Sequence, residues 1–129
     1  MMSKYEAWEA EFAEAMARFE ESLRQEKSEF MRDSAIMRFM LVFDLAWKLV
    51  KTWLEEKRAV SCASPVTCFR EAYTQEILGD YDDGWSRIIK MRSNAVHTYN
   101  LKLAEQVYGA LPEALAAFQK LVEMLKKQK

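Results

Sequence analysis

The segment 92–99, which reads RSNAVHTY, holds the side chains of this sequence best suited to acid–base and phosphate chemistry. His97 is the single histidine of the chain, and imidazole is the side chain that exchanges a proton most readily near neutral pH. Arg92 carries a planar fork of donors that suits phosphate oxygens. Tyr99 adds a hydroxyl two positions after His97. The segment therefore predicts proton transfer beside a bound phosphate.

A regular helix would hold these residues badly. At about 100° per residue, Arg92 and Tyr99 share one stripe, whereas Arg92 and His97 lie about 140° apart. The helix must therefore end near His97, or Arg92 and His97 must act on one substrate across a symmetric interface between two copies. A structural interpretation stays open beside these. In it, Arg92 pairs with a carboxylate, His97 caps a helix end, and Tyr99 packs its ring with its hydroxyl in water.

The composition predicts one all-helical domain, residues 1–129. Three glycines and two prolines among 129 residues leave little turn material for a sheet, while half of the residues are hydrophobic. The 19 basic and 20 acidic residues nearly cancel, so any contact with RNA must be local. Charges interrupt every long apolar run, and the first residues lack the pattern of a signal peptide. We expect a cytoplasmic protein without a membrane partner.

The two cysteines, Cys62 and Cys68, make a weak metal site, because neither a histidine nor a second cysteine pair lies nearby. We expect two reduced thiols. The sequence thus predicts no metal and no cofactor.

Apolar side chains at three- and four-residue steps predict an antiparallel up-and-down bundle of about five helices. The first covers residues 3–29. The second covers 36–54, with Asp33 or Ser34 as candidate N-cap. The third begins at Ser64-Pro65 and stops at Gly79, where a turn-rich linker (79–84) begins. The fourth runs from 85 toward 96, and the fifth starts after an Asn100 cap, with a kink or restart at Pro112.

The helix over 36–54 is apolar nearly all round, so it is central to the bundle or has its second face covered by another subunit. Within it, Trp47 and Trp53 are expected in the core or at an interface. Asp44 is expected to pair with a basic residue.

Several short motifs occur in one order along residues 34–108: Arg38-Phe39, Phe43-Asp44-Leu45-Ala46-Trp47-Lys48, Ser64-Pro65, Phe69-Arg70-Glu71-Ala72, and Arg92 to Tyr99. This combination resembles the nucleotidyltransferase substrate-binding-like family of the HEPN superfamily. The resemblance implies a HEPN-like helical bundle that forms a homodimer. It also implies a second protein, a minimal nucleotidyltransferase encoded beside it, with which the dimer forms a toxin–antitoxin-like complex.

The resemblance also assigns roles to residues. In similar toxins this motif is a metal-independent ribonuclease site, in which His97 would move the proton and Arg92 would stabilise charge on the phosphate. Asn94 and Ser93 would support them, and the partner would attach AMP to Tyr99. Such chemistry needs no metal because the 2′-hydroxyl of RNA is the nucleophile. Two residues depart from the pattern: Ser93 where relatives often carry Asn or Asp, and Met40 where they often carry Glu.

Two alternatives remain beside the ribonuclease. The protein could be a non-catalytic subunit that presents substrate, or its own Tyr99, to the nucleotidyltransferase. It could also be a helical dimer with a purely structural role, in which case replacing Arg92 or His97 would change stability alone.

Overall fold

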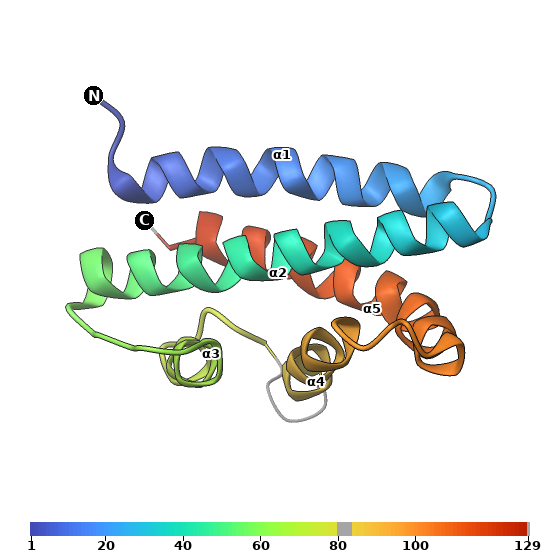
Figure 1. Ribbon diagram of the computed structural model, residues 1–129. Coiled ribbons are helices and arrows are strands. Elements are labelled where there is room, and N and C mark those ends of the chain that lie inside the picture. Colours follow the sequence, from blue (N-terminus) through green and yellow to red (C-terminus); the bar gives the residue numbers. More distant parts are fainter. Residues whose placement is uncertain (80–83, 129) are drawn as a thin grey trace.

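The computed structural model describes residues 1–79 and 84–128, and these residues form an all-α bundle, as the composition predicts (Figure 1). The chain order is α1 (Lys4–Arg24), α2 (Glu29–Arg58), α3 (Pro65–Thr74), α4 (Ser86–Ala95) and α5 (Leu101–Lys126). Most of the predicted 79–84 linker lies outside the described residues.

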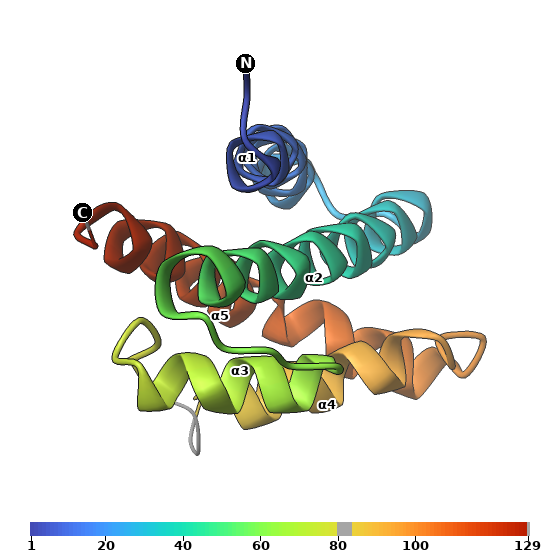
Figure 2. The same ribbon diagram turned by 90° about the vertical axis from the view of Figure 1, so that its left-hand side faces the viewer.

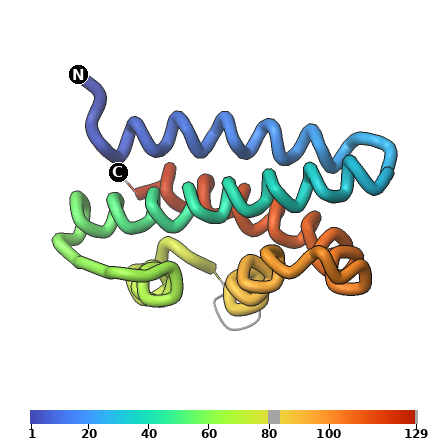
Figure 3. Tube along the Cα trace, viewed as in Figure 1, coloured from blue at the N-terminus to red at the C-terminus, as the bar shows by residue number. Residues whose placement is uncertain are grey.

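Three long helices form the body of the molecule. α1 and α2 run antiparallel, and α5 packs against both (Figure 1). The short helices α3 and α4 are seen nearly end-on in Figure 1 and lengthwise in Figure 2, so they cross the long helices. The trace in Figure 3 shows the short connection that leads from α4 into α5. α2 packs against all four other helices, which confirms its predicted central place.

The first interhelical turn lies earlier in the chain than predicted. α1 ends at Arg24, and α2 begins at Glu29, where the Ser28 hydroxyl accepts a hydrogen bond from the backbone amide of Met31. The predicted caps at Asp33 and Ser34 are wrong. The reason is Arg32: it is a buried residue of α2, but its charge hides the start of the apolar stripe in the sequence.

The later helix ends follow local chemistry more closely. Ser64 caps α3 with Pro65 at its first position, as predicted. α3 ends at Thr74, because Glu76 takes a left-handed conformation with φ 64° and the chain turns before Gly79. Asn100 caps α5 as predicted, accepting from the Leu103 amide at 3.1 Å. α5 does not restart at Pro112, which lies exposed within one continuous helix.

An aromatic cluster occupies the centre of the core. Phe118 of α5 lies 6.2 Å from both Phe12 and Phe39, measured between ring centroids. Phe69 of α3 stacks on Trp85 at 4.5 Å, which ties the crosswise layer to this cluster. Trp53 is buried, as expected.

The expectation of two reduced cysteines is wrong. Cys62 and Cys68 form a disulfide, with their Cα atoms 5.2 Å apart, within the range that a disulfide spans. The backbone explains the pairing. After α2 ends, Ala59 takes a left-handed conformation and the connection runs into α3, which brings Cys62 against the first turn of that helix.

A charged cluster holds the beginning of α5 against the turn between α1 and α2. Glu105 accepts hydrogen bonds from Lys27 and from Arg32, the latter at 3.1 Å. These bonds lower the pKa of the Glu105 carboxyl, and bonds to Glu105 and Asp33 raise the pKa of Arg32. The α4–α5 connection therefore leads into a helix whose first turn is fixed.

Among the described residues, no helix combines the length and apolarity that crossing a bilayer requires.

Candidate functional site

α4 ends just before His97, as the spacing argument predicts. The last helical residue is the buried Ala95, and the amide of His97 donates to the carbonyl of Asn94 at 2.9 Å. The amide of Asn100 then donates to the carbonyl of His97 at 3.1 Å. The Thr98 hydroxyl closes back on the Ala95 carbonyl, also at 3.1 Å. Residues 96–100 thus form a hydrogen-bonded turn, which frees His97 and Tyr99 from helical spacing.

Arg92 is held from across the bundle by Asp44 of α2. Its Nε and Nη2 atoms donate to the two carboxylate oxygens, each at 3.2 Å. This confirms that Asp44 pairs with a basic residue. The side chains are 24% and 40% exposed, so the pair lies at the surface of the molecule and not in the core. A two-point contact fixes the plane of the guanidinium group, and Nη1 keeps its hydrogens free of partners among the described residues.

Met40 does not leave Arg92 without a carboxylate. Asp44 lies one helical turn later and supplies a carboxylate to Arg92 directly.

His97 and Tyr99 form an exposed pair of rings. Tyr99 is 83% exposed, more than any other tyrosine in the part of the chain that the structure describes. Its hydroxyl oxygen lies 3.5 Å from Nδ1 of His97, and the two rings meet edge to face with centroids 5.9 Å apart. That separation is the outer limit of a hydrogen bond, so a small rotation of either ring would bring a proton donor and acceptor together. Because the Tyr99 ring is not buried, the stability of the fold does not explain why a tyrosine occupies this position.

Asn94 and Ser93, the two residues expected to support the site, make different contacts. Asn94 contributes its backbone carbonyl, which fixes the amide of His97, and its side chain is half-buried. The Ser93 hydroxyl instead points back along α4 to the carbonyl of Ile89, at 3.4 Å. Ser93 is therefore not brought to Arg92 or His97 by any contact within the described residues.

An exposed apolar face of α2 adjoins the Arg92–Asp44 pair. Met37 and Leu41 are 58% and 54% exposed, and their spacing to Asp44 places all three on one side of the helix. Phe30 at the start of α2 is also exposed. The sequence carried the signal for this face, because α2 has apolar residues on every side. It could not show which side remains uncovered.

Comparison with known proteins agrees with this fold, and the similarity extends beyond the short motifs of residues 34–108. The model of a family described as nucleotidyltransferase substrate binding protein like matches residues 5–127. The chain belongs to this family. A crystal structure of a protein from Thermus thermophilus superposes with a TM-score of 0.82 at 31% sequence identity, covering 88% of this chain and 98% of that one. A search of curated proteins finds no match.

Membership of the nucleotidyltransferase substrate binding protein like family confirms the resemblance drawn from residues 34–108. The match also takes in α1 from Tyr5 onward and the remainder of α5.

Proposed function

We propose that this protein is the substrate-side component of a two-protein nucleotidyltransferase system, and that the Tyr99 hydroxyl accepts the transferred nucleotide. The observation that carries the proposal is the exposure of Tyr99, 83%, with its hydroxyl beside Nδ1 of His97. The family description supplies the class of partner, a nucleotidyltransferase. A separate enzyme can reach this hydroxyl without any rearrangement of the bundle.

The transfer reaction needs only a few groups. The Tyr99 oxygen attacks the α-phosphorus of ATP held by the partner. A new P–O bond forms to Tyr99, the bond to pyrophosphate breaks, and His97 takes the phenolic proton through Nδ1. The added AMP would place a bulky anion beside Arg92 and His97. Modification would therefore occupy the space in which any other phosphate would contact Arg92 and His97.

A homodimer is part of this proposal. The support is the exposed apolar face of α2, since contiguous apolar surface of this kind is rarely left in water. A twofold contact through this face would bring the Arg92–Asp44 pairs of two copies toward each other, because Asp44 lies on the same side of α2 as Met37 and Leu41. Each motif would then meet its copy in one groove.

The second candidate function is metal-independent cleavage of RNA in that groove. Two observations favour it: the guanidinium group of Arg92 is already oriented by Asp44, and the His97 ring is exposed. His97 would take the proton of the 2′-hydroxyl, and the resulting oxyanion would attack the adjacent phosphorus. The bond to the 5′-oxygen would break, and that oxygen would take a proton from water, which leaves a 2′,3′-cyclic phosphate. A cytoplasmic location is part of this proposal, since ATP and RNA are both available there.

Transfer to Tyr99 is tested with the proposed partner nucleotidyltransferase, Mg²⁺ and ATP labelled at the α-phosphate. We expect label on the wild-type chain and none on Tyr99→Phe. Tyr73→Phe is the matched control, because Tyr73 is another exposed tyrosine on α3. Equal labelling of both variants, or no labelling of the wild type, would show the proposal to be wrong.

Cleavage is tested separately with protein shown by mass to be unmodified. A mixture of transfer and messenger RNA is incubated in EDTA with wild type and with His97→Ala. Cleavage that disappears in the variant supports the ribonuclease. Intact RNA in both samples rejects it and leaves nucleotide acceptance as the single function.

The homodimer is tested by sedimentation equilibrium. Leu41→Asp places a charge on the exposed face of α2 and should shift the mass from dimer to monomer, whereas Glu14→Gln on α1 should leave it unchanged. A wild-type chain that sediments as a monomer would contradict the dimer.

A further inference from the structure

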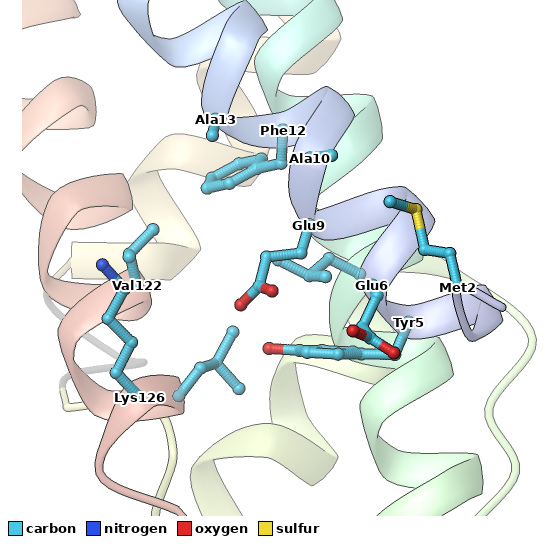
Figure 4. A pocket seen from close by; sticks show the side chains of 11 residues that line it. Met2, Tyr5, Glu6, Glu9, Ala10, Phe12, Ala13, Val122 and Lys126 are labelled. Atoms are coloured by element: carbon cyan, nitrogen blue, oxygen red, sulfur yellow. The ribbon is translucent and has the colours of Figure 1, made fainter.

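A cavity of about 470 Å³ opens between the beginning of α1 and the end of α5, at the opposite end of α5 from the Tyr99 turn (Figure 4). Small-molecule sites in proteins typically have volumes of about 300–1,000 Å³. The cavity is thus large enough for a ligand of one or two rings, and none of the residues of the 92–99 motif lines it.

The floor of the cavity is apolar and fixed by the core. Phe12, Leu49 and Leu125 line it, and each is buried. Three different helices contribute these side chains, so the floor cannot close without moving the bundle. An apolar ligand body would replace water on this floor and gain the usual free energy of burial.

The wall formed by α1 carries the polar groups. Figure 4 shows the Glu9 carboxylate and the Tyr5 hydroxyl pointing into the same space between α1 and α5. Within the described part of the chain, Glu9 has no ion pair and no side-chain hydrogen bond. Glu6 also lines the cavity, but one of its oxygens accepts from the Ser3 amide at 3.2 Å as part of the α1 cap.

The electrostatic environment of this wall favours a cation. Burial, and then the charges of Glu9 and Glu56, raise the pKa of Tyr5 to about 12, so the hydroxyl stays protonated beside the carboxylates. The C-terminal end of α5 adds the negative end of a helix dipole. Lys126 is the one basic side chain in the lining, against two glutamates.

We propose that this cavity binds a small organic cation, in which an ammonium group contacts Glu9 and an apolar ring or chain lies on Phe12, Leu49 and Leu125. The Tyr5 hydroxyl stands beside Glu9 and accepts a second hydrogen bond from the ammonium group. An anionic ligand of the same shape would meet Glu9 and Glu6 and is excluded. The site is separate from the proposed nucleotide acceptor, and neither proposal depends on the other.

Three indoles of matched size test the proposal: tryptamine carries an ammonium group, tryptophol a hydroxyl in the same place, and indole-3-acetate a carboxylate. Each is titrated into ¹⁵N-labelled full-length protein, and the amide shifts of α1 and of the end of α5 are followed. We expect tryptamine to saturate these shifts and indole-3-acetate not to bind. Tryptophol should bind at least about tenfold more weakly than tryptamine, because its hydroxyl cannot form the charge-assisted hydrogen bond that the ammonium group forms with Glu9.

Glu9→Gln should weaken tryptamine binding about tenfold and leave tryptophol binding unchanged. Glu14→Gln is the matched control: it removes the same charge from an exposed position of α1 outside the cavity and should change neither. The unliganded spectra serve to check that both variants fold. The proposal is overturned if tryptamine causes no saturable shift at millimolar concentration, if it binds no more tightly than tryptophol, or if Glu9→Gln binds it like the wild type.

Discussion

The inner side of α2 and the turn between α4 and α5 use aromatic side chains in opposite ways. Phe39 of α2 is completely buried and contacts the rings of Phe19, Phe43 and Phe118. Tyr99 in the turn is 83% exposed and contacts one ring, that of His97. Folding explains the first arrangement, because burial of a large apolar ring stabilises the bundle. It does not explain the second, so the turn is the region in which side-chain identity reports on function.

The largest effect should come from the interior. Phe118→Ala removes a ring that contacts four other aromatic residues, and should lower the free energy of unfolding by about 3–5 kcal/mol. Urea denaturation followed by far-ultraviolet circular dichroism measures the loss. A change below about 1 kcal/mol would mean that the aromatic cluster is not the centre of the core.

An intermediate effect is expected at the connection between α2 and α3. Cys62→Ala removes the disulfide and frees a short loop in the unfolded chain, so stability should fall by about 2 kcal/mol. The same urea experiment on wild-type protein, with and without dithiothreitol, provides the control. The prediction fails if dithiothreitol does not change the urea midpoint of the wild type and Cys62→Ala unfolds at the same midpoint. In that case the two thiols do not stabilise the protein as a disulfide.

A smaller effect is expected where the two regions meet. Asp44→Asn keeps the shape of the side chain but removes the charge that holds Arg92 in a half-exposed pair, which should cost about 0.5–1 kcal/mol. Function should suffer more than stability, because Arg92 would lose its fixed plane. Activity equal to wild type, measured as labelling of Tyr99 or as RNA cleavage, would show that the orientation of Arg92 is unimportant.

The smallest effect on stability should come from Tyr99→Phe. The hydroxyl is exposed and its one neighbour is 3.5 Å away, so the free energy of unfolding should stay within about 0.5 kcal/mol of wild type. A larger loss would turn Tyr99 into a structural residue and remove the contrast between the two regions.

Helix content and the core were predictable because they follow from periodicity. Phe12, Phe19 and Phe39 repeat on helical stripes, and Ser64 and Asn100 act as caps by their own chemistry. The start of α2 was missed because the buried Arg32 breaks the apolar pattern, and its charge is satisfied by Glu105 from the other end of the chain. A local pattern carries no information on such a partner.

The geometry of the candidate site was predictable only in part. The spacing of Arg92 and His97 predicted either a helix end near His97 or a shared site across a symmetric interface, and the turn after Ala95 provides the helix end. The sequence expected a basic partner for Asp44 but could not say that it would be Arg92, 48 residues away. The disulfide was missed for a similar reason, because the path of the α2–α3 connection decides whether two cysteines meet.

The most direct test of the central claim is the mass of the proteolytic peptide that contains Tyr99, after the full-length chain has been incubated with the nucleotidyltransferase proposed as its partner, Mg²⁺ and ATP. We predict that this peptide gains the mass of one or more AMP units and that fragmentation places them on the Tyr99 oxygen. A Tyr99 peptide of unchanged mass, or AMP found on another residue, would contradict the account.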